Sequence, residues 1–457
     1  MAEEKHDLIV IGGGPAGYVG AIRAAQMGKK VALIERDRAG GTCLNWGCIP
    51  TKALIRNAEV YRLVQKAADF GIQTGSVSFE WDRVIARSRG VSDRIAKGLE
   101  FLFKKNKIET ISGQAQLGPD RSVRINGQTL GAEKVLLATG AKPRLIPGFQ
   151  PDGKKFLTSR EAMVIPKRPD SILIIGGGAI GIEFAYFFNS FGTKVTVVEA
   201  LPSILPKEDH EISGELSKIF TRSGIRILTG TTVDKLIAQG EGVEVALGGA
   251  FPATEQFETV LCAIGVVPHL DFLTDPNQLV LEKGFVKTDD HYQTSIPGVY
   301  GAGDLIGPPW LAHVASYEAI QAVEGMFGEH APSKPKVFPS CTYCHPQVAS
   351  TGLTENECKA RGIAYKVGKY PFLSSGKALA QGDNQGFVKL INSEPDGRLL
   401  GCHIIGADAT ELIAEMALAM NFELTAADIA ATVHAHPTLS EIVFEAAEMS
   451  LGKAIHG

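Results

Sequence analysis

Two cysteines, Cys43 and Cys48, lie close together in the segment Gly40–Lys52, and their spacing is suited to thiol–disulfide chemistry. On a regular helix this spacing gives about 7.5 Å of rise and about 140° of rotation, whereas a disulfide needs Cα atoms within about 4.4–6.8 Å. A straight helix therefore could not join them, and Gly47 offers a bend. Pro50 suits the first turn of a following helix, which places Cys48 near a helix N-terminus, where thiolate is favoured. The segment predicts a reactive cysteine pair, although two reduced, buried cysteines remain the alternative.

The composition of the 457-residue chain is that of a globular protein with about three domains. A formal net charge of −4 gives no electrostatic basis for binding nucleic acid. The N-terminus lacks the basic start and long apolar core of a secretion signal, and no stretch reaches the length of a membrane span. Seven scattered cysteines do not resemble a secreted disulfide framework. We therefore expect a cytoplasmic protein with neither membrane nor nucleic-acid partners, in which a lasting disulfide would be catalytic.

The first glycine cluster has the pattern of a dinucleotide-binding unit. A short apolar strand at residues 7–11 leads into GGGPAG, an Ala-rich helical stretch and a second strand that ends in an acid. Gly12 would turn the chain, Gly14 would admit a pyrophosphate, and Gly17 would let helix and strand pack closely. Glu35 is placed to accept hydrogen bonds from a ribose.

The same unit returns at residues 171–199. Gly176, Gly178 and Gly181 take the glycine positions, and Glu199 follows at the interval that separates Gly12 from Glu35. A 2′-phosphate would require Arg or Lys near the end of this strand, so Glu199 favours NAD over NADP. One such motif is weak evidence, but two in their strand and helix context predict an α/β fold with two Rossmann-like domains. After the linker-like stretch 331–335, short strands followed by helices indicate an α+β domain.

The cysteine segment resembles the redox motif of the FAD-dependent pyridine nucleotide-disulfide oxidoreductase family, in the form that acts on dihydrolipoyl groups. His434–Glu441 resembles the near-C-terminal motif of this family, and Gly301–Asp304 resembles its second flavin-binding motif. With both glycine fingerprints, the resemblance covers essentially the whole chain. It implies an FAD-binding domain at 1–145, an NAD-binding domain at 146–270, a central domain that completes the FAD site at 271–335, and an interface (dimerisation) domain at 336–457.

The resemblance also implies roles for the reactive residues. Cys43 would be the thiol that exchanges with dihydrolipoyl groups, and Cys48 the thiol that passes electrons to the flavin. His436 would be the acid–base catalyst, oriented by Glu441 and contributed by the partner subunit of a homodimer. A lipoyl thiol is mostly protonated at neutral pH, so its attack on a disulfide needs a base, and histidine suits that task. Lys52 would lie near the isoalloxazine ring and assist catalysis there.

The implied cofactor-binding residues form two sets. Those for FAD are Gly12, Gly14, Gly17, Glu35, Lys52, Gly113, Thr139, Gly140 and Asp304, with Asp304 on the ribityl chain. Those associated with NAD and its surroundings are Gly176, Gly178, Gly181, Glu183, Glu199 and Gly265, with Glu183 expected to pair with Lys52.

The implied reaction oxidises dihydrolipoyl groups to the lipoyl disulfide and reduces NAD⁺ to NADH through a Cys43–Cys48 redox disulfide and FAD. The implied partners are a second copy of the chain and the lipoyl domains of a 2-oxo acid dehydrogenase or glycine cleavage complex. The alternative is a related reductase of glutathione, another small disulfide or mercuric ion. A catalytically idle subunit of a complex is a further alternative.

Three residues depart from the family pattern. Val266 replaces an arginine on the rim of the expected NAD site, Cys344 replaces a threonine, and Gln347 replaces a glutamate. None of them removes a group that electron flow needs. Cys341 and Cys344 have a spacing that zinc ligands use, but no second cysteine pair accompanies them, and we expect no metal site.

Overall fold

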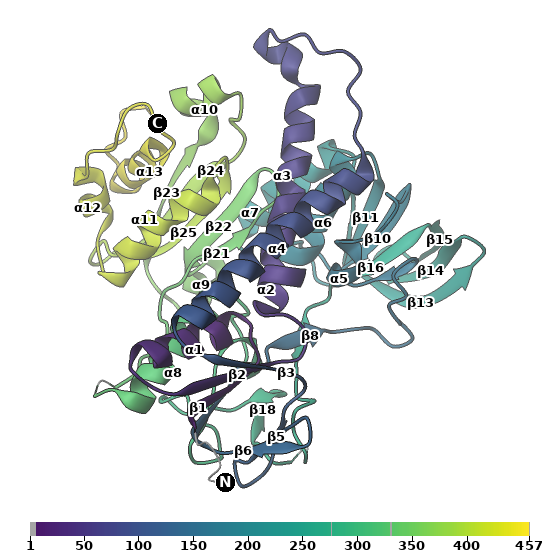
Figure 1. The fold of residues 1–457 in the computed structure, drawn as a ribbon. Helices are drawn as coiled ribbons and strands as arrows, with labels where there is room; N and C mark the ends of the chain where they lie inside the picture. Colours follow the sequence, from purple (N-terminus) through teal and green to yellow (C-terminus); the bar gives the residue numbers. More distant parts are fainter. Residues whose placement is uncertain (1–5, 276, 330, 457) are drawn as a thin grey trace. The chain divides into compact units, whose positions relative to one another are not determined.

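The computed structural model describes residues 6–275, 277–329 and 331–456, drawn as a ribbon in Figure 1. The chain forms two compact units. The first unit comprises the chain up to residue 53 together with 83–144 and 265–335. The second comprises 54–82, 145–264 and the chain from 336 onward. The expected α/β class is confirmed, and the four domain ranges expected from the sequence remain predictions.

A parallel five-stranded sheet in the order β20-β7-β1-β2-β3 forms the centre of the first unit. Along each strand, successive side chains point to opposite faces of the sheet. Leu8 and Val10 of β1 pack against one core, and Ile9 and Ile11 against another. The strands are β1 (His6–Ile11), β2 (Val31–Glu35), β3 (Glu109–Ser112), β7 (Ala132–Leu137) and β20 (Val299–Gly301).

Two helices cover one face of this sheet, α1 (Pro15–Gln26) and α8 (Ala312–Phe327), and share the Leu8 core. A small antiparallel sheet covers the other face with Leu117, Val123 and Ile125. Its strands are β4 (Gln116–Leu117), β5 (Val123–Ile125) and β6 (Gln128–Leu130). Two short strand pairs complete the unit: β8 (Ala141–Pro143) with β17 (Val266–Pro268), and β18 (Leu281–Glu282) with β19 (Phe285–Val286).

Three helices follow or flank the cysteine segment: α2 (Gly41–Trp46), α3 (Cys48–Gln65) and α4 (Trp81–Lys105). Between α3 and α4 lie a short 3₁₀ turn at Ala67–Phe70 and residues 73–80, which are neither helix nor strand.

The second unit contains a parallel sheet in the order β12-β11-β10-β16-β9. Helix α6 (Ala179–Ser190) follows the second glycine cluster, and an antiparallel sheet shares a core with Leu173 and Ile175 of β10. The strands of the parallel sheet are β9 (Phe156–Leu157), β10 (Ser171–Ile175), β11 (Lys194–Glu199), β12 (Arg226–Thr229) and β16 (Thr259–Cys262). Those of the antiparallel sheet are β13 (Thr231–Gln239), β14 (Gly242–Gly249) and β15 (Ala253–Phe257). Helices α5 (Ser159–Ala162) and α7 (His210–Arg222) complete this part.

The C-terminal region is an antiparallel sheet in the order β21-β22-β25-β24-β23 with helices packed on one face, as the expected α+β pattern requires. Its strands are β21 (Ser340–Thr342), β22 (Gln347–Gly352), β23 (Tyr365–Pro371), β24 (Phe387–Ser393) and β25 (Leu399–Gly406). Its helices are α9 (Glu355–Ala360), α10 (Gly376–Gln381), α11 (Ala409–Asn421), α12 (Ala426–Ala431) and α13 (Glu441–Leu451). Among the described residues, none of the helices combines the length and apolar character needed to cross a membrane.

Candidate active site

The two cysteines lie on either side of a break between two helices. Helix α2 ends before Gly47, whose backbone angles of φ −150° and ψ −116° are not helical, and α3 begins at Cys48. A Cβ on Gly47 would lie 3.0 Å from the Thr42 carbonyl oxygen, so this close turn favours glycine. The bend brings the Cys43 and Cys48 side chains within hydrogen-bonding reach of each other. The bend expected at Gly47 and the place of Cys48 at a helix start are confirmed.

The surroundings of Cys43 raise the pKa of its thiol. The hydrogen bond to Cys48 raises the pKa of the Cys43 thiol, burial and the Cys48 charge raise it further, and Lys52 opposes them. The Cys43 thiol therefore holds its proton more firmly than an ordinary thiol does. Burial raises the pKa of Tyr18, and the charges of both cysteines add to that effect, so this phenol borders the pair.

Helix α4 supports the cysteine segment from behind. Ser88 donates a hydrogen bond to the Pro50 carbonyl oxygen at 2.8 Å, and Arg89 donates to the Asn45 carbonyl oxygen at 2.6 Å. The Arg89 guanidinium also lies over the Trp46 ring, 4.5 Å from its centroid. These contacts fix both sides of the Gly47 break.

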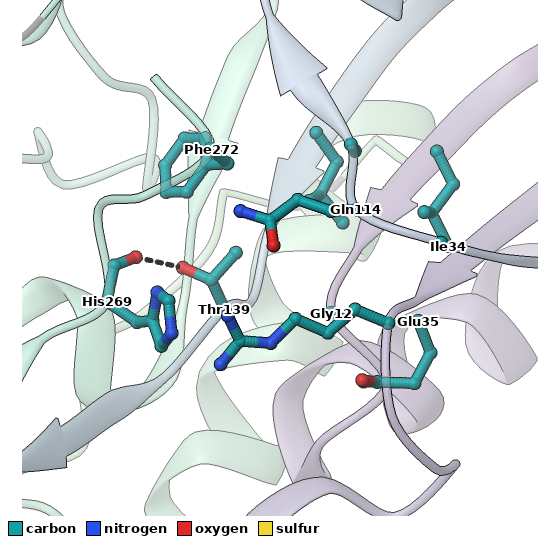
Figure 2. A pocket seen from close by; sticks show the side chains of 11 residues that line it. Gly12, Ile34, Glu35, Gln114, Thr139, His269 and Phe272 are labelled. Atoms are coloured by element: carbon teal, nitrogen blue, oxygen red, sulfur yellow. Dashed lines mark hydrogen bonds between the residues drawn. The ribbon is translucent and has the colours of Figure 1, made fainter. Parts of the chain in front are cut away.

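A pocket opens at the carboxyl ends of β1 and β2, where an α/β sheet commonly binds nucleotides (Figure 2). Four of the expected FAD residues line it: Gly12, Glu35, Gly113 and Thr139. The Thr139 hydroxyl donates to the His269 carbonyl oxygen at 2.8 Å, which Figure 2 shows as a dashed line. The remaining lining residues are Ile11, Ile34, Arg36, Gln114, Ala115, His269 and Phe272.

Backbone amides hold the Glu35 carboxylate in this pocket. Gly13 N–H donates to Oε2 at 2.7 Å, and Asp37 N–H donates to Oε1 at 2.8 Å. Each carboxylate oxygen accepts more than one hydrogen bond, so both retain capacity for ribose hydroxyls. Glu35 is thus oriented for the role that its position predicted.

The turn before α1 has room for a phosphate group. Gly14 is the N-cap of α1, and no heavy atom of the described residues lies within 4 Å of the position that a Gly14 Cβ would take. A glycine N-cap supplies no side-chain acceptor for the first N–H groups of a helix, which then suit an anion. A Cβ on Gly17 would instead overlap the Gly12 carbonyl oxygen, which explains the close packing of helix on strand. The residues present therefore fit the pyrophosphate of FAD.

Asp304 lies at the second predicted flavin motif, next to a tightly held glycine. Gly303 has φ +74°, and its N–H donates to Oε2 of the buried Glu318 at 2.8 Å. Burial raises the pKa of Glu318 to about 7 and that of Asp304 to about 6. The charge of Asp304 also contributes to raising the pKa of Cys43, so the two residues border one region of the first unit.

The second unit repeats the carboxylate arrangement of the first. Gly177 N–H donates to Oε2 of Glu199 at 2.7 Å, and Leu201 N–H donates to its Oε1 at 2.8 Å. Gly178 is the N-cap of α6, again with no described heavy atom within 4 Å of its would-be Cβ. A Cβ on Gly181 would overlap the Gly176 carbonyl oxygen. The internal repeat expected from the sequence therefore extends to individual hydrogen bonds, and the second site fits a dinucleotide as the first does.

His436 and Glu441 form a pair at the start of α13. The imidazole Nδ1 lies 2.8 Å from Glu441 Oε1, while Thr438 N–H donates to the other carboxylate oxygen at 2.8 Å. Although burial opposes them, these two contacts hold the pKa of Glu441 below its usual range. A carboxylate that accepts from Nδ1 leaves Nε2 as the basic nitrogen. The His436 side chain is 81% exposed in the single chain.

Neighbouring His434 has a different environment. Its Nε2 lies 3.0 Å from Glu415 Oε1, and its Nδ1 lies 2.9 Å from the Thr432 carbonyl oxygen. Both ring nitrogens thus have partners within the chain, which is the arrangement of a structural histidine.

Two of the departures from the family pattern have structural explanations. Gln347 Oε1 accepts from the Thr410 N–H at 3.1 Å and from its hydroxyl at 2.8 Å, so Gln347 caps the start of α11. The buried Cys344 thiol donates to the Pro346 carbonyl oxygen at 3.1 Å. Val266 lies in β17, paired with Pro143. Glu183 is buried and accepts from the Tyr343 N–H at 3.0 Å, while its pairing with Lys52 remains a prediction.

The sequence did not reveal that His269 and Phe272 line the pocket beside Glu35. His269 and Phe272 enter it through a strand pair that joins β17 to β8, and this long-range pairing has no local signature. Arg36 and Gln114 directly follow the predicted residues Glu35 and Gly113. Their position in the sequence could therefore have indicated that they line the pocket.

The family of the chain follows from comparison with known proteins. Residues 6–319 match the model of the pyridine nucleotide-disulphide oxidoreductases, and residues 338–447 match the dimerisation domain of the same family. The chain therefore belongs to the pyridine nucleotide-disulphide oxidoreductases, and its cofactors are FAD and NAD.

Individual relatives cover nearly the whole chain. It is 44% identical to a dihydrolipoyl dehydrogenase of Zymomonas mobilis over 99% of each protein, and 42% identical to one of Bacillus subtilis over 100% of each. Among solved structures, LpdA from Mycobacterium tuberculosis superimposes with a TM-score of 0.89 at 27% identity, covering 96% of this chain and 99% of that one.

Proposed function

We propose that this protein oxidises dihydrolipoyl groups to the lipoyl disulfide and reduces NAD⁺ to NADH. The observation that carries the proposal is the cysteine pair at the Gly47 break. The same chain has two dinucleotide sites, in each of which a glycine N–H donates to a glutamate, Glu35 or Glu199. The curated relatives named dihydrolipoyl dehydrogenase support the choice of substrate.

The cysteine pair exchanges with the substrate dithiol. A substrate thiolate attacks Cys43 Sγ, the Cys43–Cys48 bond breaks, and its electron pair goes to Cys48 as thiolate. The second substrate thiolate then attacks the substrate sulfur bound to Cys43, which releases the lipoyl disulfide and the Cys43 thiolate. One of the two protons lost by the dithiol returns to Cys43 and restores its thiol. The raised pKa of Cys43 supports the return of this residue as a thiol. Bound FAD supplies the two-electron acceptor between Cys48 and NAD⁺.

His436 accepts the protons that the dithiol loses. Nε2 of the imidazole is the base, because Glu441 fixes the tautomer through Nδ1. The exposure of His436 in one chain supports its contribution to the site of a partner subunit, as does the family dimerisation region. Lys52 stands in the first turns of α3, after Cys48, where its charge favours thiolate in the pair.

Glu199 supports NAD over NADP as the electron acceptor. Its carboxylate is held by two backbone N–H groups at the position for a ribose 2′-hydroxyl, where a 2′-phosphate would meet a negative charge. This argues against a glutathione reductase that depends on NADP.

The assembly and location follow the same reasoning. The working form is a homodimer that serves the lipoyl domains of a 2-oxo acid dehydrogenase or glycine cleavage complex. The cysteine pattern of the sequence supports a cytoplasmic location, where a disulfide that forms and breaks is a catalytic device.

A comparison of two reductions tests the proposal. The purified protein should oxidise NADH with lipoamide at a rate far above its oxidation of NADPH with glutathione. A faster NADPH and glutathione reaction would contradict it.

A further inference from the structure

Lys389 of β24 is fully buried, and its ammonium group contacts three carboxylates. Nζ lies 2.9 Å from Asp209 Oδ1, 2.8 Å from Glu211 Oε2 and 2.7 Å from Glu355 Oε2. Lys369 adds a second cation, 2.6 Å from Glu211 Oε1. We call these five residues the Lys389 cluster.

Lys389 and its three carboxylate partners favour the charged form of one another. Although burial opposes it, the three carboxylates raise the pKa of Lys389. Lys359 and Lys389 lower the pKa of Glu355 to about 2. Lys389 and its three carboxylate partners therefore stay charged across the working range of pH, and losing one partner would leave a buried charge uncompensated.

The cluster ties the C-terminal sheet to the start of α7. Asp209 is the N-cap of α7, where its Oδ1 accepts from Glu211 N–H at 3.1 Å. Its other oxygen accepts from Glu355 N–H, also at 3.1 Å, at the start of α9. The carboxylate thus joins helices from the dinucleotide-binding part and the C-terminal part of the second unit, with Lys389 between them.

The segment 200–209 runs from Glu199 to this anchor. Near its middle, Leu205 N–H donates to the Gly177 carbonyl oxygen at 2.8 Å, and Ser213 donates to the Leu205 carbonyl oxygen at 3.0 Å. A Cβ on Gly177 would lie 3.0 Å from the Ile204 side chain, so the segment also packs directly behind the glycine turn. The segment is therefore held at Glu199, at the glycine turn and at Asp209.

We propose that the Lys389 cluster is a positioning device for NAD, acting through the segment 200–209 on Glu199 and the glycine turn at Gly177. The inference rests on the NAD site proposed above. Displacement of Asp209 would move Leu205 and weaken the support of the Gly177 carbonyl. The contacts described above lead from the cluster to the segment 200–209, so the expected effect is on NAD.

Two variants test the device: Asp209→Asn, which keeps a side-chain oxygen for the N-cap but loses the charge, and Lys389→Met. The KM for NAD⁺ and the KM for dihydrolipoamide are measured at saturating co-substrate, together with bound FAD. We expect the KM for NAD⁺ to rise about tenfold, because the displaced segment would lose part of the binding energy for NAD. The KM for dihydrolipoamide should stay within about twofold of the wild-type value. Arg226→Ala is the matched control, because it removes a partly exposed ion pair between β12 and Glu255 of β15 in the same unit and should change neither constant.

A purely structural cluster gives a different result. Asp209→Asn would then lower the unfolding temperature while both KM values stay unchanged or rise together, and either outcome overturns the inference. If Lys389→Met does not fold, the two KM values of Asp209→Asn alone decide whether the inference holds. Glu199→Gln separates the inference from the proposed site: if it leaves the KM for NAD⁺ unchanged, the NAD site itself is wrong.

Discussion

Replacing Gly178 by alanine should weaken NAD binding without disturbing the fold. Gly178 has φ −75° and ψ −179°, which alanine adopts without strain, and its new methyl group would meet no heavy atom of the described residues within 4 Å. The methyl would instead occupy the space beside the first N–H groups of α6, where the pyrophosphate of NAD is expected to bind. Loss of one charge-assisted hydrogen bond costs about 1.5–3 kcal/mol, which is about a 10- to 100-fold rise in the dissociation constant.

The assay separates the two dinucleotide sites. The KM for NAD⁺ should rise by the factor given above, while bound FAD and the single-turnover reduction of the flavin by dihydrolipoamide should be unchanged. The stability should change by no more than about 1 kcal/mol. Gly14→Ala is the matched variant in the first unit and should lower FAD occupancy instead. Gly181→Ala should misfold, since its Cβ overlaps the Gly176 carbonyl oxygen. Loss of FAD from Gly178→Ala with normal use of NAD⁺ would refute the assignment of the sites.

Two further predictions concern carboxylates. Burial raises the pKa of Glu208 from 4.5 to about 7, so ionisation costs the folded protein about 3 kcal/mol above pH 7. Glu208→Gln should therefore increase the free energy of unfolding at about pH 8. The gain should fade as the pH falls from about 7 to about 4.5, below which both states are protonated. An equal gain at both pH values in denaturant titrations would rule out ionisation as the cause. Glu441→Gln should slow flavin reduction by dihydrolipoamide about tenfold or more, because the tautomer of His436 is no longer fixed, and should leave flavin reduction by NADH unchanged. Equal slowing of both half-reactions in stopped-flow traces would count against this role of Glu441.

The features predicted well from the sequence are those that depend on local spacing. The glycine fingerprints, their closing acids and the bend at Gly47 each lie within a short stretch, where the backbone conformation follows from residue type. The family resemblance added His436, which is far along the chain from the cysteines.

What the sequence could not predict depends on packing between distant segments. His269 enters the first pocket only because β17 pairs with β8. Lys389 has no motif around it, and its role emerges only when β24 is packed against the start of α7. The sequence marked Gln347 only as a departure from the family pattern, whereas the structure shows that it caps α11.

The most direct test of the central claim is flavin reduction in Cys48→Ser. The variant is mixed anaerobically with dihydrolipoamide and, separately, with NADH, while the flavin absorbance is followed. Electron flow from the dithiol through Cys48 predicts that dihydrolipoamide fails to bleach the flavin and that NADH bleaches it at the wild-type rate. Bleaching by dihydrolipoamide at the wild-type rate would contradict the account.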